Sequence, residues 1–144
     1  MGRVLIVDDY PPLANVLAIG LRRRGHQVTS VGSKLRAERA LEESTYDCAV
    51  LDMDLPDGSG LELARTVLQG QRVLSVVFFS ANDEHEVMQQ ALQFGPLVSK
   101  SSGLDTVLNL VDEQLLVLRR KVANAEDTPA PRLGGVSGFR RRVR

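Results

Sequence analysis

Five short apolar runs alternate with longer segments of helical periodicity, and this alternation limits the folds open to the chain. The runs lie at residues 3–7, 27–31, 48–51, 72–80 and 97–99. The longer segments repeat their apolar residues every three or four positions, as amphipathic helices do. Strands that alternate with helices along a chain typically form a mostly parallel sheet. We therefore predict an α/β protein with five strands and five helices.

Local sequence signals mark the ends of the predicted helices. Pro12 suits the first turn of a helix, and Gly25 is a typical residue for its end. Ser33 is a candidate N-cap for the second helix. Ser102, followed three residues later by Asp105, predicts a capping box at the start of the last helix. The third and fourth helices are predicted at residues 61–68 and 82–94.

Size and charge indicate one acidic domain with a basic end. A chain of 144 residues, 43% of them hydrophobic, is long enough for one compact domain with its own core. The 18 basic and 18 acidic residues balance, but residues 132–144 contain five arginines and no acid, which leaves 13 basic against 18 acidic elsewhere. From residue 123 the composition turns to Asn, Pro, Gly and Ser, which is typical of linkers. We predict a domain over residues 1–122 and a flexible Pro/Gly/Arg-rich tail over 123–144.

Cysteine content and hydropathy predict a cytoplasmic protein. Cys48 is the single cysteine, so no intramolecular disulfide can form, as expected in a reducing compartment. The apolar run near the N-terminus, residues 4–7, is far too short for a secretion signal or a membrane span. No membrane partner is expected.

Charged side chains follow the ends of three predicted strands. Asp8 and Asp9 come directly after the first strand, Asp52 after the third, Asp54 two residues later, and Lys100 after the fifth. Because the carboxyl ends of parallel strands share one edge of the sheet, these residues are expected to converge there. The sequence therefore predicts a functional crevice at this edge.

Grouped carboxylates and a lysine suggest phosphoryl chemistry. The carboxylates repel one another unless a cation lies among them, and Mg²⁺ commonly binds one or two carboxylates together with phosphate oxygens. Asp9 and Asp52 are predicted to bind it directly, and Asp8 through water. An aspartate can act as a nucleophile toward a phosphoryl group, and Asp52 is the best candidate. Lys100 would balance the transferred charge, while the Ser80 hydroxyl would donate a hydrogen bond to the same oxygens.

Residues 3–118 resemble the receiver domains of two-component response regulators. The resemblance lies in VLIVDD, VLDMDLPDGSG, FFSA and VSK, which occur in order and at fitting intervals. It implies a flavodoxin-like, doubly wound sheet of order 2-1-3-4-5. It also implies that Asp52 accepts a phosphoryl group from a histidine kinase or phosphotransfer protein. Mg²⁺ would be held by Asp8, Asp9, Asp52 and the backbone carbonyl of Asp54, while Ser80 and Lys100 contact the phosphoryl group.

The implied role is that of a signalling phosphoacceptor, not an enzyme: it would promote only its own phosphorylation and dephosphorylation. The acyl phosphate would draw Ser80 and Lys100 toward it and reshape a distant face that a downstream protein recognises. The basic tail offers phosphate contacts, but no helix-turn-helix follows the receiver segment, so nucleic-acid binding is not expected from this chain alone.

The chain departs from the family pattern near its fifth strand. Leu97 occupies the position of a common aromatic switch residue, the connection from Gly95 to Lys100 is shorter than usual, and Ser101 replaces a frequent proline. Phe94 is a candidate replacement for the aromatic. These departures leave open a second hypothesis, a degenerate receiver that acts as a constitutive interaction module.

The last predicted helix carries a stripe of leucine and valine at heptad spacing. Up to Leu115 the stripe is expected to face the sheet. Beyond Leu116 the helix would outrun the sheet, so its end is a candidate surface for a homodimer.

A third hypothesis is a phosphatase of the haloacid dehalogenase type. Its nucleophile motif reads D-x-D-x-T, and Asp52 and Asp54 match it, but Pro56 replaces the threonine. That motif usually follows the first strand, whereas here about fifty residues precede it, and the hypothesis leaves Asp8 and Asp9 without a role.

Overall fold

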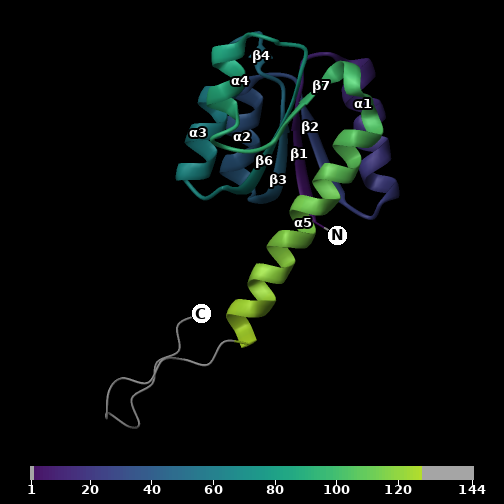
Figure 1. The fold of residues 1–144 in the computed structure, drawn as a ribbon, viewed down its shortest axis with the longest axis vertical. Helices are drawn as coiled ribbons and strands as arrows, with labels where there is room; N and C mark the ends of the chain where they lie inside the picture. The colour runs from purple at the N-terminus through teal and green to yellow at the C-terminus, as the bar shows by residue number, and fades with distance from the viewer. Residues whose placement is uncertain (1, 128–144) are drawn as a thin grey trace.

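Five parallel strands form the central sheet of the computed structural model, which describes residues 2–127 (Figure 1). The strands are β1 (Arg3–Val7), β2 (Gln27–Val31), β3 (Tyr46–Leu51), β6 (Val73–Ser80) and β7 (Leu97–Ser99). Their spatial order is β2-β1-β3-β6-β7, and every pairing is parallel. In the sequence order of the five strands this is 2-1-3-4-5. The predicted flavodoxin-like topology is confirmed.

Helices cover both faces of the sheet. They are α1 (Pro11–Arg23), α2 (Lys34–Glu43), α3 (Gly60–Gln69), α4 (His85–Ala91) and α5 (Leu104–Asp127). Figure 1 shows α1 and α5 on one face and α2, α3 and α4 on the other. Neighbouring residues of β6 point to opposite sides, so Phe78 packs in the α2–α3–α4 core and Phe79 in the α1–α5 core. Burial on both faces explains the mostly apolar character of the central strands β1, β3 and β6.

The fourth helix is shorter than the predicted range of residues 82–94. Its beginning is delayed because Asn82 forms the local hydrogen bonds of a turn. The Asn82 backbone N–H donates to Ser80 Oγ at 3.1 Å, and Asn82 Oδ1 accepts from the Glu84 N–H at 2.9 Å. Helix α4 therefore spans only His85–Ala91.

The predicted N-terminal cap of α2 is confirmed, but that of α5 is not. Ser33 caps α2 as predicted, because its Oγ accepts a hydrogen bond of 3.1 Å from the Arg36 N–H. The predicted capping box at Ser102 is wrong. Ser102 ends a short 3₁₀ helix (Lys100–Ser102), and Gly103, with a φ of +96°, separates it from α5.

A small hairpin, which the sequence analysis treated as a loop, links β3 to α3. Its strands are β4 (Asp54–Leu55) and β5 (Gly58–Ser59), paired antiparallel. It ends at Gly60, where a Cβ atom would lie 2.0 Å from the backbone oxygen of Asp52. Only glycine allows the chain to pass this close to the end of β3.

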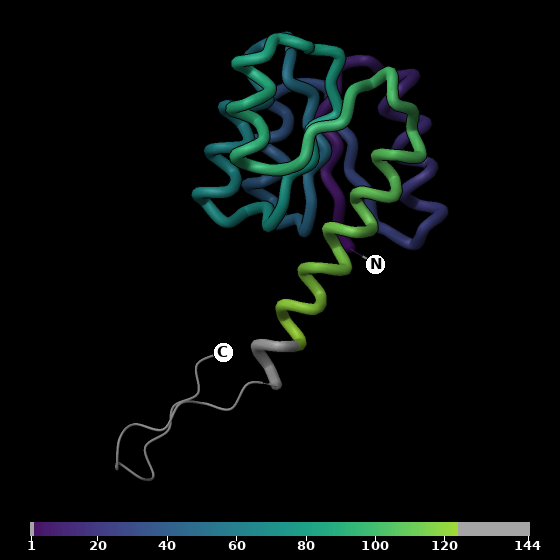
Figure 2. Tube along the Cα trace, viewed as in Figure 1, coloured from purple at the N-terminus to yellow at the C-terminus, as the bar shows by residue number. Residues whose placement is uncertain are grey.

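Helix α5 packs on the sheet with its first half and continues beyond it. Leu108, Val111 and Leu115 are buried in the α1–α5 core, as predicted for the stripe up to Leu115. Figure 2 shows the later turns leaving the body of the domain, and Val122 there is 54% exposed. The expected boundary after residue 122 falls inside α5, which ends at Asp127. Most of the predicted tail lies outside the described residues.

Membrane insertion has no candidate segment among residues 2–127. None of their helices combines the length and the hydropathy that a bilayer span requires.

Candidate functional site

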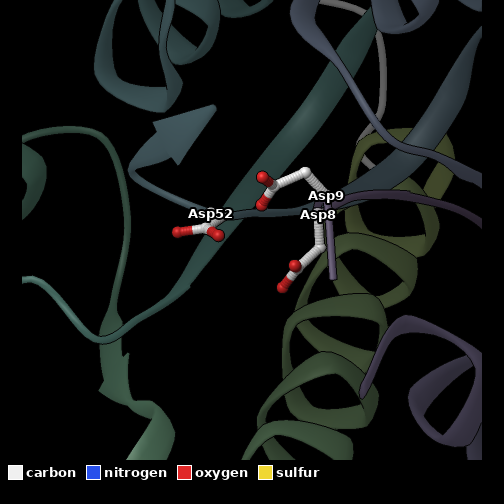
Figure 3. Close-up of side chains that lie close together, drawn as sticks. All are labelled: Asp8, Asp9 and Asp52. Atoms are coloured by element: carbon white, nitrogen blue, oxygen red, sulfur yellow. The ribbon is translucent and has the colours of Figure 1, made fainter. Parts of the chain in front are cut away.

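Three carboxylates gather at the carboxyl edge of the sheet. Asp8 and Asp9 follow β1, and Asp52 follows the neighbouring β3. One oxygen of each carboxylate lies within 4.8 Å of the others (Figure 3). Asp8 and Asp52 are each only 6% exposed, whereas Asp9 is exposed to solvent. The cluster therefore has two buried carboxylates and one at its mouth.

Lys100 joins the cluster from the end of β7. Its Nζ lies 3.0 Å from Asp8 Oδ2 and 3.0 Å from Asp52 Oδ2, so one ammonium bridges two strands. Burial disfavours the charged amine, but the hydrogen bonds to Asp52 and Asp8 outweigh this effect and raise the pKa of Lys100. Lys100 is thus charged at neutral pH.

Asp52 has the most unusual electrostatic environment in the cluster. Burial raises the pKa of Asp52, and hydrogen bonds from Lys100 and from the Asp54 N–H, 3.2 Å from Asp52 Oδ1, only partly oppose this. The negative charge of Asp8 acts in the same direction as burial. Ser80 Oγ donates a longer hydrogen bond, 3.5 Å, to Asp52 Oδ1. Two donors therefore converge on one carboxylate oxygen and an ammonium on the other.

The structure places each predicted site residue. Five side chains meet in one place: Asp8, Asp9, Asp52, Ser80 and Lys100. Asp54 contacts the cluster only through its backbone N–H, while its side chain is exposed.

Asn82 is a site residue that the sequence analysis did not select. Its Nδ2 lies 3.4 Å from both carboxylate oxygens of Asp54, which links the loop after β6 to the hairpin after β3. The signal was its position two residues after Ser80, as Asp54 lies two residues after Asp52. Asp54 and Asn82 together form one side of the mouth of the site.

The chemistry of the donor set fits a hard divalent cation. Three carboxylates opposed by one ammonium leave an excess of negative charge in a partly buried space, and oxygen atoms are the ligands that Mg²⁺ prefers. Asp9, at the exposed side, gives such an ion a route from solvent.

The segment that departs from the family pattern is closely packed. Leu97 and Phe94 both pack against the α2–α3–α4 core, and the guanidinium of Arg65 lies 5.6 Å from the centre of the Phe94 ring. A Cβ atom on Gly95 would lie 2.0 Å from the backbone oxygen of Val76. The short connection is therefore held against β6.

Comparison with known proteins gives a consistent assignment. The model of the response regulator receiver domain matches residues 4–112. The transcriptional regulatory protein KdpE of Mycobacterium tuberculosis is 34% identical over 128 residues, which cover 88% of this chain and 55% of that protein. The DNA-binding response regulator MtrA of Mycolicibacterium smegmatis is 30% identical over 133 residues, or 91% of this chain and 55% of that protein. The chain spans about half the length of these relatives.

Solved structures share the fold. A CheY-like receiver domain protein from Methanospirillum hungatei superposes with a TM-score of 0.78 at 20% identity, covering 84% of this chain and 98% of that one. The response regulator TrrA of Thermotoga maritima, solved in complex with Mg²⁺ and BeF, gives a TM-score of 0.70 at 23% identity, covering 79% and 99%. Since the family model matches well over half of its residues, the chain belongs to the response regulator receiver domains, the signalling domains of two-component systems.

Proposed function

We propose that this chain accepts a phosphoryl group on Asp52 from a histidine kinase or phosphotransfer protein and passes the signal to a downstream protein. The observation that carries the proposal is the position of Asp52, buried between Lys100 Nζ and Ser80 Oγ and beside Asp8. An Asp52 carboxylate oxygen would attack the phosphorus of a phosphohistidine in line. The new O–P bond forms as the N–P bond breaks, and the donor imidazole leaves.

The proposed cofactor is Mg²⁺. Asp9 and Asp52 would bind it directly, with Asp8 and the backbone carbonyl of Asp54 completing the protein ligands. When bound, the ion supplies positive charge that stabilises the phosphoryl oxygens in the transition state. Lys100 would contact the same oxygens from the other side, and Ser80 would donate its hydroxyl to them.

Intact mass spectrometry of the full chain tests the proposal. Incubation with acetyl phosphate and Mg²⁺ should add one phosphoryl group, and chelation with EDTA should prevent it. A folded protein that takes no label from acetyl phosphate or from a kinase would favour the degenerate receiver. Continuous release of phosphate from a simple ester would favour the phosphatase hypothesis.

The signal is proposed to travel by a population shift. An acyl phosphate on Asp52 would draw Ser80 and Lys100 toward its oxygens and favour one of two conformers. With Leu97 in place of the usual aromatic, Phe94 is the proposed aromatic of the output face, because it already packs on the core beside α4.

The cytoplasmic location of the chain stays a prediction, as do a domain over residues 1–122 and a tail over 123–144.

Asp54 is proposed to set the lifetime of the acyl phosphate. Its carboxylate stands two residues beyond Asp52 and is held by the Asn82 amide, where it can accept a hydrogen bond from an attacking water. Replacing Asp54 with Asn should slow the decay of the label roughly three- to tenfold, because a neutral amide is a weaker acceptor than a carboxylate and orients the attacking water less well. The measurement is the decay of the labelled mass after removal of the phosphodonor.

Asp83→Asn is the matched control for Asp54. It removes an exposed carboxylate from the neighbouring loop, so it reports the effect of charge alone. Equal decay rates for the wild type and Asp54→Asn would contradict the role of Asp54. A similar change in both variants would reduce that role to electrostatics.

We also propose that the projecting end of α5 pairs with α5 of a second copy. Leu116, Val117 and Val122 are between 42% and 54% exposed there. Val122 continues the heptad stripe one step beyond Leu118, which still packs partly against the α1–α5 core. Apolar residues at this spacing favour a coiled coil. Sedimentation velocity should show a dimer that Val122→Asp weakens at least about tenfold. A wild type that stays monomeric at high concentration would contradict the pairing.

A further inference from the structure

Helix α2 is capped by a residue from the hairpin that follows Asp52. The first N–H groups of a helix have no partner within it and need one from elsewhere. Ser33 satisfies the Arg36 N–H. Asp57, in the turn of the β4–β5 hairpin, satisfies the two before it: its Oδ1 accepts from the Lys34 N–H at 2.7 Å, and its Oδ2 accepts from the Leu35 N–H at 2.9 Å. The β4–β5 hairpin thus supplies two hydrogen-bond acceptors to the N-terminus of a helix that lies about twenty residues earlier in the chain.

The charge of Asp57 suits this position. The first turn of α2 contains no acid of its own, and the positive end of a helix favours a carboxylate. The hydrogen bonds from the Leu35 and Lys34 N–H groups lower the pKa of Asp57, so the carboxylate stays ionised and able to accept both bonds.

A second contact holds the same two elements together. The stem of Lys34 lies against Gly58, where a Cβ atom would be 2.7 Å from Lys34 Cδ. The Lys34 ammonium lies 4.0 Å from Glu62 Oε2 at the start of α3. The hairpin therefore rests on the beginning of α2 through the backbone, the Lys34 stem and the Asp57 carboxylate.

The other end of the hairpin reaches the phosphoacceptor. Asp54 begins β4 and donates its N–H to Asp52, and the Gly60 N–H donates to the Met53 oxygen at 2.9 Å. On the α2 side, β2 ends at Val31, whose oxygen accepts the Asp8 N–H at 3.1 Å. The Asp57 contact thus joins the segment that carries Asp52 and Asp54 to the segment that supports Asp8.

We propose that Asp57 is a positioning residue for the phosphoacceptor site. By fixing the turn of the hairpin to α2, it holds the backbone at Asp54, a proposed metal ligand, in place before the metal binds. Asp57 itself touches neither the metal nor the phosphoryl group. This inference rests on the proposed function and adds a residue that prepares its site.

The test compares four full-length proteins: the wild type, Asp57→Ala, Asp57→Asn and Ser33→Ala. Mg²⁺ alone is titrated by calorimetry, and amide hydrogen exchange is followed by NMR at Lys34 and Leu35. Asp57→Ala should weaken Mg²⁺ binding about fivefold, less than the roughly 10–100-fold typical of groups that contact a metal ligand directly. It should also speed exchange at both amides. Asp57→Asn keeps an oxygen acceptor and should restore part of the affinity.

Ser33→Ala separates positioning from stability. It removes the other side-chain cap of α2 and should lower the melting temperature while leaving Mg²⁺ affinity unchanged, because it does not touch the hairpin. Equal affinities for the wild type and Asp57→Ala would overturn the inference. Equal losses in Asp57→Ala and Ser33→Ala would also overturn it, because the effect would then be one of helix stability.

Failure of the proposed function gives a different result. In that case the wild type itself takes no label and binds no Mg²⁺. If the wild type is labelled normally but the Asp57 variants match it, the proposed function stands and only the positioning role fails.

Discussion

Replacing Asp52 with asparagine is expected to abolish the phosphoryl label and, at the same time, to stabilise the unlabelled protein at neutral pH. The label is lost because an amide cannot supply the nucleophilic oxygen. The gain in the free energy of unfolding should be on the order of 1 kcal/mol, because the variant no longer buries a charge beside Asp8. Intact mass reports the first effect and urea unfolding at pH 7 the second.

The sign of the stability change follows from the raised pKa of Asp52. Burial raises the pKa of Asp52 in the folded protein above its ordinary value of 3.8. Between that value and the raised pKa, the folded protein keeps a proton that the unfolded chain has already released. Stability falls as the pH rises through this window, and the loss persists at neutral pH. The difference between the wild type and Asp52→Asn should therefore shrink below this window.

Asp83→Asn serves as the control for Asp52→Asn, because it neutralises an exposed carboxylate at the same edge of the sheet. Surface changes of this kind typically alter stability by no more than about 0.5 kcal/mol. Label on Asp52→Asn would show that another residue accepts the phosphoryl group. Equal stability of the wild type and Asp52→Asn would show that Asp52 is not electrostatically disfavoured.

The sheet and its chemistry were predictable because they depend on strongly patterned segments. Strands such as Val73–Ser80 are mostly apolar and are buried on both faces from Val76 onward, so their hydrophobic pattern locates them. Parallel pairing then requires that Asp8, Asp52 and Lys100 meet at one edge, as they do. Boundaries that depend on local competition were harder: Asn82 forms a turn where the apolar period predicted helix, and Gly103 takes the position next to α5 that Ser102 was expected to cap.

Contacts between loops that lie far apart in the chain could not be predicted from the sequence. The residues 54–59 contain one proline and one glycine, typical of a loop, and only the fold reveals that four of them pair as a hairpin. The bonds from the Lys34 and Leu35 N–H groups to Asp57 depend on where that hairpin lies relative to α2. The Asn82 contact with Asp54 likewise joins two loops, and their distance from each other in space cannot be read from the local sequence of either loop. Such residues are found from side-chain geometry, not from periodicity.

Lys100→Met should lower the free energy of unfolding by about 2 kcal/mol when no divalent cation is present, because Asp8 and Asp52 lose the ammonium that lies 3.0 Å from each. Breaking a fully buried pair typically costs about 3–5 kcal/mol, and partial solvent access to Lys100 reduces the expected value here. Urea unfolding with EDTA measures this loss. Saturating Mg²⁺ should restore much of it, since a divalent ion among the carboxylates replaces the missing positive charge.

The pH dependence of the Lys100→Met effect distinguishes electrostatics from packing. Two hydrogen bonds overcome the burial cost and raise the folded pKa of Lys100 above its ordinary value of 10.5, so the stabilisation by its charge is complete below that value. It is lost as the pH rises through the folded pKa, and the wild type and the variant should converge there. Lys121→Met removes the charge of an exposed lysine on α5 and should change stability by no more than about 0.5 kcal/mol. A Lys100→Met deficit that neither Mg²⁺ nor alkaline pH reduces would mean that Lys100 stabilises the fold through its methylene groups and not by holding Asp8 and Asp52 together.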